Sequence, residues 1–254
     1  MISELQLYRF TFYVLAAATV GFLVWVGRMP AGKRRYYLPI PALCATLALA
    51  YFGMSIELLR ITTVDGHPTP MSRYVDYIII TPVTISTAGL VAGATRRQLA
   101  VTNALSLIWI GSTAAGYFLA PPLDSVASLI TIVSLVVLIY MMVWPITKQS
   151  VEQSGERVLL YGKLRNLLIL LWVLYLVFGF ATRQNLGLLD AFTGIFFGAY
   201  LDVLTRIGFG VLVLRATDAT GQLIEQIESD GSDGDGSSGV TLEKSDDAAV
   251  DPAD

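Results

Sequence analysis

The chain has 254 residues, of which 54% are hydrophobic and only 15% are charged, and its mean hydropathy is +0.63. These values exclude an ordinary soluble domain of this length and indicate an integral membrane protein. The formal net charge of −3 conceals a separation, because acidic residues are concentrated in the C-terminal tail and basic residues in particular connections.

A bilayer core of roughly 30 Å requires about 20 mostly apolar residues per helix. Seven stretches of this kind occur, at residues 8–26, 37–59, 74–94, 99–119, 125–144, 159–181 and 188–214. Most connections between them are short, which is typical of an up-and-down bundle. We therefore predict an all-α membrane protein, an up-and-down bundle of these seven transmembrane helices.

The connection at residues 60–73 is longer and contains Asp65-Gly66 and two prolines, which predicts a small hairpin across the outer surface. The connections after the first, third and fifth stretches, together with Arg215, hold eleven Lys and Arg residues, whereas the other side holds Arg9, Arg60 and Arg183. The positive-inside rule therefore places the N-terminus outside and the C-terminus in the cytoplasm.

Three segments are expected along the chain: the helix bundle at residues 1–215, a short cytoplasmic helical extension at 216–228, and a tail at 229–254. The extension keeps a helical apolar pattern, whereas the tail is rich in Gly, Ser and Asp and should be disordered. Between Asp230 and Asp254 there are eight acidic residues and one lysine. This composition indicates a solvated acidic tail, with a partner-binding tail as the alternative.

Ionisable groups inside a membrane span are costly, and each is a candidate functional residue that should have a partner. Four lie well inside the spans: Arg73 and Asp76 on the third helix, three residues apart, and Asp202 and Arg206 on the seventh, four apart. Both spacings place the two members on one helix face. If these helices face each other, the four side chains form a neutral cluster. The alternative is an ionic cluster that only ties the two helices together.

Three aromatic residues, Tyr77, Trp172 and Tyr175, lie at levels where they can line one cavity. Plain packing between helices is the alternative interpretation of such aromatics. On the face of the third helix that carries Asp76, a proton path toward the cytoplasm would need a carboxylic acid near Thr87, and the sequence has none there. Outward proton pumping is therefore disfavoured.

Three motifs carry a resemblance to haloarchaeal rhodopsins. The third helix has RYVDY at residues 73–77 and TP at 81–82, similar to the RYxDW signature with a downstream TP. The sixth has LRN at 164–166 followed by LWVLY at 171–175, and the seventh has YLDVLTRIGFG at 200–210, which resembles YLDxxTKxGFG. On these residues the chain is identified as a member of the microbial rhodopsin family of archaeal type. Its pattern most resembles sensory rhodopsin II and bacteriorhodopsin-like opsins.

In that family, retinal is joined as a Schiff base to the lysine of the seventh helix. The resemblance makes Asp76 and Asp202 its counterions, with Arg73 beside them, and Arg206 stands at the lysine position. A Schiff base requires a neutral primary amine, whereas a guanidinium stays protonated and delocalised. The lysines of the chain lie in predicted loops, at a helix end or in the tail: Lys33, Lys148, Lys163 and Lys244. No covalent retinal is expected, and retinal is possible only as a noncovalent ligand.

Other departures concern the walls of the retinal pocket. The proline that the family has in its sixth helix corresponds to Leu176, and the second tryptophan of that helix corresponds to Gly179. The aromatic residue of the family's fifth helix that packs on the retinal ring corresponds to Ser128. Two features of the sensory branch remain. Thr205 and Tyr175 resemble the threonine and tyrosine of a signalling hydrogen bond, and Tyr200 matches a tyrosine at the transducer-facing surface of the family.

The favoured hypothesis is a sensory-rhodopsin-like opsin of the cell membrane that signals through protein contacts, with Arg206 as a permanent cation held by Asp76 and Asp202. The alternatives are a photoreceptor that binds retinal or another polyene noncovalently and, less favoured, ion transport gated by the charged cluster. We expect no enzymatic activity and no nucleic-acid partner. The expected partners are the bilayer, a transducer membrane protein contacting the sixth and seventh helices, and a second copy of the chain.

Overall fold

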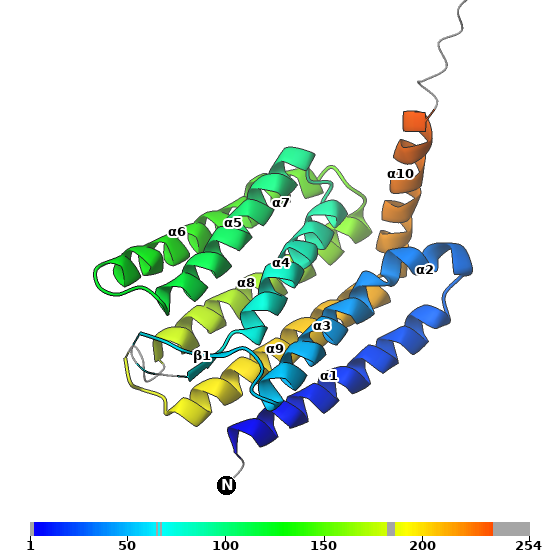
Figure 1. The fold of residues 1–254 in the computed structure, drawn as a ribbon. Coiled ribbons are helices and arrows are strands. Elements are labelled where there is room, and N and C mark those ends of the chain that lie inside the picture. Colours follow the sequence, from blue (N-terminus) through cyan, green and yellow to red (C-terminus); the bar gives the residue numbers. More distant parts are fainter. Residues whose placement is uncertain (1–2, 65, 67, 182–185, 236–254) are drawn as a thin grey trace, which may run out of the picture.

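The computed structural model describes residues 3–64, 66, 68–181 and 186–235. Within them the chain forms a bundle of long helices with one short hairpin (Figure 1). The bundle helices are α1 Glu4–Gly27, α2 Ala31–Tyr37, α3 Pro39–Ser55, α4 Ser72–Val91, α5 Arg96–Gly116, α6 Leu123–Val143, α7 Pro145–Ser150, α8 Gly155–Ala181 and α9 Ala191–Arg215. The strands are β1 Arg60–Thr62 and β2 Pro68–Pro70, and α10 Thr217–Asp235 follows the bundle.

Six helices in the described part of the chain are long and apolar enough to cross a membrane, and there are seven such spans if the bent pair α2 and α3 counts as one. This pair is bent by 41°. The break falls at Leu38, directly before Pro39, whose backbone has no N–H to continue the helical ladder of α2. The predicted all-α, multi-pass membrane bundle is confirmed.

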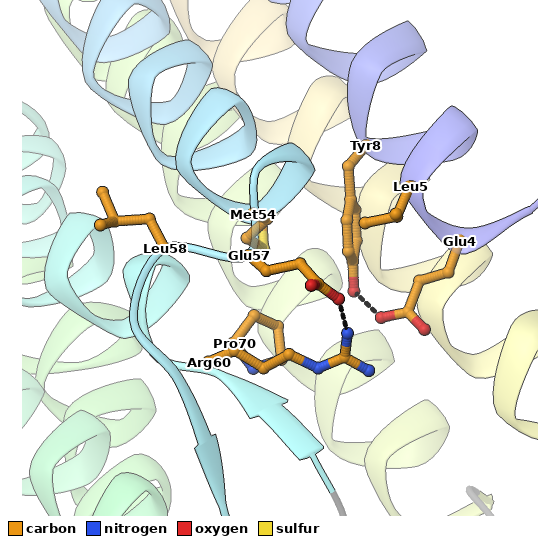
Figure 2. A pocket seen from close by; sticks show the side chains of 8 residues that line it. All are labelled: Glu4, Leu5, Tyr8, Met54, Glu57, Leu58, Arg60 and Pro70. Carbon is orange, nitrogen blue, oxygen red and sulfur yellow. Dashed lines mark hydrogen bonds and ion pairs between the residues drawn. The ribbon is translucent and has the colours of Figure 1, made fainter.

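The second predicted span was too long at its C-terminal end. We expected a helix to Leu59, but α3 ends at Ser55 because Glu57 and Leu59 adopt left-handed φ angles of 59° and 57°. The chain then enters the predicted hairpin, in which β1 and β2 pair antiparallel with Ile61 opposite Thr69. Figure 2 shows this loop against the start of α1, where an ion pair joins Glu57 to Arg60.

The ends of the bundle differ in character. We call the end where α2, α7 and α10 lie the basic end, because the predicted cytoplasmic Lys and Arg residues gather there, and the opposite one the hairpin end (Figure 1). The larger buried cluster of apolar side chains occupies the half toward the basic end, with Leu138, Leu164 and Phe209 fully buried. Packing therefore fixes α6, α8 and α9 against one another on one side of the charged residues.

Helix α10 is longer than the sequence predicts. The expected extension ended at residue 228, with disorder from 229, yet α10 continues to Asp235. Adding residues to an existing helix is easier than starting one, so a helix can continue through residues of polar composition. The acidic tail stays a prediction. Buried Ile224 and Ala219 anchor the start of this helix. The rest of the predicted tail, 236–254, lies outside the described residues.

Gly210 on α9 marks a close approach between helices. A Cβ there would lie 2.7 Å and 2.8 Å from ring atoms of Phe22 and 3.0 Å from Ile40 Cγ2. We predict that Gly210→Ala destabilises the bundle by about 1–3 kcal/mol through overpacking. The free energy of unfolding in SDS, followed by circular dichroism of the solubilised protein, measures this loss.

Gly208→Ala is the matched control for this change. It adds the same methyl group to the same helix, but its Cβ would lie 3.5 Å from Leu167, an ordinary contact distance. We expect Gly208→Ala to leave the unfolding free energy nearly unchanged. Equal losses for the two variants would contradict the close approach at Gly210.

Candidate functional site

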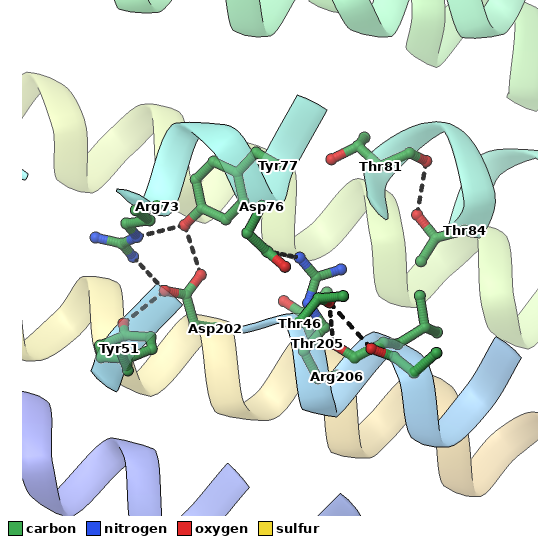
Figure 3. Close-up of polar contacts among 12 residues, drawn as sticks. Thr46, Tyr51, Arg73, Asp76, Tyr77, Thr81, Thr84, Asp202, Thr205 and Arg206 are labelled. Carbon is green, nitrogen blue, oxygen red and sulfur yellow. Dashed lines mark hydrogen bonds and ion pairs between the residues drawn. The ribbon is translucent and has the colours of Figure 1, made fainter. Parts of the chain in front are cut away.

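The charged residues inside the bundle lie on α4 and α9, which run in the same direction. Three residues along α4 advance about 4.5 Å and four along α9 about 6 Å, so the spacings Arg73 to Asp76 and Asp202 to Arg206 match closely. Two cross-helix ion pairs result (Figure 3), Arg73 Nη2 to Asp202 Oδ2 at 2.8 Å and Arg206 Nη2 to Asp76 Oδ2 at 2.5 Å. The structure thus brings the four predicted side chains together.

Asp202 is the most heavily bonded residue of the site. Its Oδ1 accepts hydrogen bonds from the hydroxyls of Tyr77 and Tyr175, each at 2.5 Å, and its Oδ2 accepts one from the Tyr51 hydroxyl at 2.6 Å. Together with Arg73, the described residues thus supply four donors, which fills the acceptor capacity of a carboxylate. Buried carboxylates are tolerated when they are satisfied in this way. Asp202 is therefore held as a carboxylate in a fixed orientation.

Arg73 is held on both sides. Its Nε donates to the Tyr77 hydroxyl at 2.5 Å, and that hydroxyl in turn donates to Asp202. Its guanidinium lies against the backbone of α9 at Gly198, where a Cβ would lie 2.7 Å from both terminal nitrogens. Gly198 is thus a positioning residue that sequence reasoning missed, since nothing in the seventh helix indicates which side chain of another helix would lie over it.

The Arg206 and Asp76 pair is more buried but less completely bonded. The two side chains are 5% and 1% exposed, so the bilayer and the protein exclude water from both charges. Beyond the single bond between them, Asp76 Oδ1 and Arg206 Nε are buried without a hydrogen-bond partner among the described residues. Removing one charge would leave the other buried and uncompensated, which is the costly case for a buried ion pair.

Tyr51 on α3 was also missed by the sequence analysis. It is a fully buried tyrosine within an apolar span, and a buried hydroxyl of this kind usually has a partner. That rule was the available signal, but which helix supplies the partner is a tertiary property. Trp172 is buried as expected, and its ring packs edge-to-face on Trp109 of α5 with centroids 5.6 Å apart. Trp109 was not predicted either.

Thr205 and Ser128 have surroundings that differ from those of their counterparts in the family resemblance. The hydroxyl of Thr205 donates to the Leu201 carbonyl at 2.6 Å while Tyr175 donates to Asp202, so this pair shares no hydrogen bond in the described structure. A threonine in mid-helix readily bonds back to the carbonyl four residues earlier. Ser128 is exposed on α6, so it is not a wall of an internal pocket.

The chemistry of the site is that of fixed charges. Two arginines and two aspartates sum to zero, and tyrosine hydroxyls satisfy one carboxylate. Among the described residues no group of three or more His, Cys, Asp or Glu side chains is placed to hold a metal ion. The arrangement can therefore stabilise one packing of α4 against α9, and it can respond to any change that removes or adds one charge.

Comparison with known proteins decides the family. The profile described as "Bacteriorhodopsin-like protein" matches residues 5–220. The chain belongs to this family of microbial rhodopsins. It is 28% identical to sensory rhodopsin-2 of Natronomonas pharaonis over 80% of this chain and 84% of the relative. Identity is 30% with sensory rhodopsin-2 of Haloarcula vallismortis, over 79% and 85%, and 30% with bacteriorhodopsin of Haloterrigena sp., over 78% and 83%.

Solved structures agree with the rhodopsin fold. Thermophilic rhodopsin from Rubrobacter xylanophilus superposes with a TM-score of 0.80 at 22% identity, covering 87% of this chain and 99% of that one. A cyanorhodopsin from Tolypothrix sp. gives 0.80 at 20% identity, covering 88% and 99%. Members of the rhodopsin family are typically non-enzymatic photoreceptors or pumps that bind retinal. Relatives named sensory rhodopsin and a relative named bacteriorhodopsin match this chain at similar identity.

The pairing within the cluster can be tested by a double-mutant cycle. We predict that Arg206→Gln and Asp76→Asn each destabilise the bundle by about 3–5 kcal/mol, because each leaves one buried charge unpaired. The double variant should lose less than the sum of the two, with a coupling energy of about 1–3 kcal/mol. Unfolding free energies in SDS provide all three values.

A second cycle serves as the control for this pairing. Asp202 bonds to Arg73 and to three tyrosines, so Asp202→Asn and Arg206→Gln should couple more weakly than Asp76→Asn and Arg206→Gln. Equal coupling in the two cycles would mean that Arg206 interacts with both aspartates alike and would contradict the observed pairing.

Proposed function

We propose that this protein is an opsin-like membrane protein that carries no covalent retinal and signals through contacts with a membrane protein partner. The observation that supports this most directly is the buried ion pair of Arg206 and Asp76. In the resemblance to the family motif, position 206 is the position of the Schiff-base lysine. Arg206 there supplies a fixed cation next to the carboxylate that would face a protonated Schiff base.

Chemistry supports the absence of a covalent link. The guanidinium of Arg206 has no neutral primary amine to attack an aldehyde. Lys33 lies in α2, and both Lys148 and Lys163 are exposed on α7 and α8, while Lys244 lies outside the described residues. The described lysines are thus all near the basic end, away from Asp76 and Asp202.

The packing of the aromatic rings favours the proposed opsin-like protein over a photoreceptor that binds retinal or another polyene noncovalently. The rings of Trp109 and Trp172 are in direct contact, and those of Tyr77 and Tyr175 lie 6.2 Å apart with both hydroxyls bonded to Asp202. A flat polyene placed between either pair would have to separate it. Of the side chains expected to line a cavity, Tyr77 and Tyr175 pack on each other, and Trp172 packs on Trp109.

The outer face of α8 and α9 is suited to a membrane partner. Five large apolar or aromatic side chains are exposed there: Val173, Val177, Phe196, Tyr200 and Leu204. Phe196, Tyr200 and Leu204 are spaced four residues apart and are 47%, 56% and 38% exposed, so they lie on one outward side of α9. Ion transport is less favoured, because two fixed arginines in the path oppose the passage of cations.

The absorption spectrum tests the missing linkage. Purified protein incubated with all-trans retinal should show no visible band beyond that of free retinal, because position 206 offers no amine. Arg206→Lys is the matched variant, since it restores an amine with a single substitution and keeps a positive charge beside Asp76. A visible band in this variant alone would show that the amine was the only missing element.

Two results would contradict the proposal. A band in the unmodified protein that survives denaturation as a covalent adduct would mean that another residue forms the linkage. A bleachable band that organic solvent extracts would instead support a photoreceptor with noncovalent retinal or another polyene.

Photo-crosslinking in native membranes tests the partner face. With benzoylphenylalanine at Tyr200 we expect one discrete adduct with a membrane protein, because that position faces outward on α9. The control places the same group at Ile108, which is 49% exposed on α5, away from α8 and α9. Identical adducts from both positions, or none from Tyr200, would argue against a partner on this face.

A further inference from the structure

A second buried arginine lies at the basic end, outside the charged cluster. Arg157 in the first turn of α8 is 5% exposed. Its Nε donates to the Val91 carbonyl at 3.0 Å, Nη2 to the Leu90 carbonyl at 2.8 Å, and Nη1 to Gln226 Oε1 at 2.7 Å. One side chain thus joins three helices, because the carbonyls belong to α4 and Gln226 belongs to α10.

The two acceptors on α4 are backbone carbonyls at its C-terminal end, and that of Leu90 also accepts from the Gly93 N–H at 3.0 Å. The last carbonyls of a helix lack intrahelical donors and carry its negative dipole end, so a cation is stabilised there. Of the ion pairs between described residues, none includes Arg157, so neutral oxygens hold its charge. Gln226 completes this set of acceptors. Without α10, one arm of a buried guanidinium would lose its described partner.

Further contacts hold α10 on the surface of the basic end. The Tyr37 hydroxyl of α2 and the Thr220 hydroxyl are bonded at 2.5 Å, both residues being buried, and Ser154 donates to Gln222. Exposed ion pairs join Lys33 to Glu225 at 3.9 Å and Arg35 to Glu228 at 3.0 Å. Helix α10 therefore touches α2, the α7–α8 turn and α8.

The contact of Arg157 with Gln226 differs from the exposed ion pairs because Arg157 is buried, although Gln226 itself is exposed. Exposed ion pairs contribute about 0–1 kcal/mol and are screened by salt. Hydrogen bonds to a charged, buried group contribute more, and losing one leaves the group unsatisfied. Attachment of α10 should thus depend on Arg157 and Gln226 rather than on Lys33, Arg35 and their acidic partners.

We propose that α10 is an intramolecular latch that holds the basic end of α8 against the end of α4 through the Gln226–Arg157–α4 contacts. While α10 is docked, Arg157 makes two hydrogen bonds to α4 and one to α10, and α10 itself packs on both α4 and α8. Release of α10 removes one acceptor and weakens the hold on the other two. The latch acts at the opposite end of α4 from Arg73 and needs no retinal.

The latch is tested by pulsed electron resonance distances and by hydrogen exchange on the full chain. Spin labels at Glu156→Cys on α8 and Arg96→Cys on α5 report the separation of these helix ends, and native Cys44 is fully buried and stays unlabelled. In Gln226→Ala and in Arg157→Gln, we expect a population at longer distance than in the unsubstituted protein. Amides of α10 should exchange about tenfold faster or more, as the loss of a hydrogen bond to a charged group implies.

Two controls keep the test specific. Lys163→Gln removes an exposed positive charge from the same helix and should change neither measurement. The double variant Glu225→Gln, Glu228→Gln, which removes both exposed ion pairs, should change exchange by less than about threefold. Gln226→Ala is the milder substitution and serves if Arg157→Gln fails to fold.

The proposal is overturned if Gln226→Ala behaves like Lys163→Gln in both measurements. It is also overturned if the double variant or 1 M salt (about 3 Å screening length) releases α10 while Gln226→Ala does not, because the surface ion pairs would then be the attachment. Neither result bears on retinal linkage, so this test stands apart from the spectrum of the Arg206→Lys variant.

Discussion

The structure depends on neutralising four charges inside an apolar bundle. Each charge alone would be costly in the membrane, and each becomes tolerable only when α4 and α9 lie in one register and at one separation. The two ion pairs therefore act as a constraint on the arrangement of the helices, since sliding α9 by one turn would leave Asp76 and Asp202 opposite the wrong partners. Tyr51 and Tyr175 extend the constraint to α3 and α8 through their bonds to Asp202. Four helices are thereby tied to one carboxylate.

The two pairs do not have equal roles. Asp202 accepts four hydrogen bonds, and Arg73 is fixed between Tyr77 and Gly198, so the pair of Arg73 and Asp202 is held rigidly. The pair of Arg206 and Asp76 is joined by one hydrogen bond, and Asp76 Oδ1 and Arg206 Nε have no hydrogen-bond partner among the described residues. Removing one charge of the Arg206–Asp76 pair would therefore leave the other buried and uncompensated, which is the costly case for a buried ion pair.

The sequence was sufficient for much of the fold. Hydropathy predicted seven spans, because the bilayer imposes length and polarity on every crossing segment, and the charge of the loops predicted an orientation that stays a prediction. The expected end of the second span was wrong, because the left-handed Glu57 and Leu59 end α3 inside an apolar stretch. There the local backbone conformation overrode composition. The hairpin was predicted because its turn residues act locally.

For the site, the sequence by itself determined which residues carry charge and which share a helix face. Spacing along one helix is a local property. The sequence alone therefore placed Arg73 and Asp76 on one face of their helix, and Asp202 and Arg206 on one face of theirs. Only the tertiary structure decided that the bonds cross between helices, that Tyr51 completes the shell of Asp202, and that Thr205 and Ser128 take no part. The rotation and depth of each helix are set by packing against its neighbours, and a single sequence holds no direct record of those contacts.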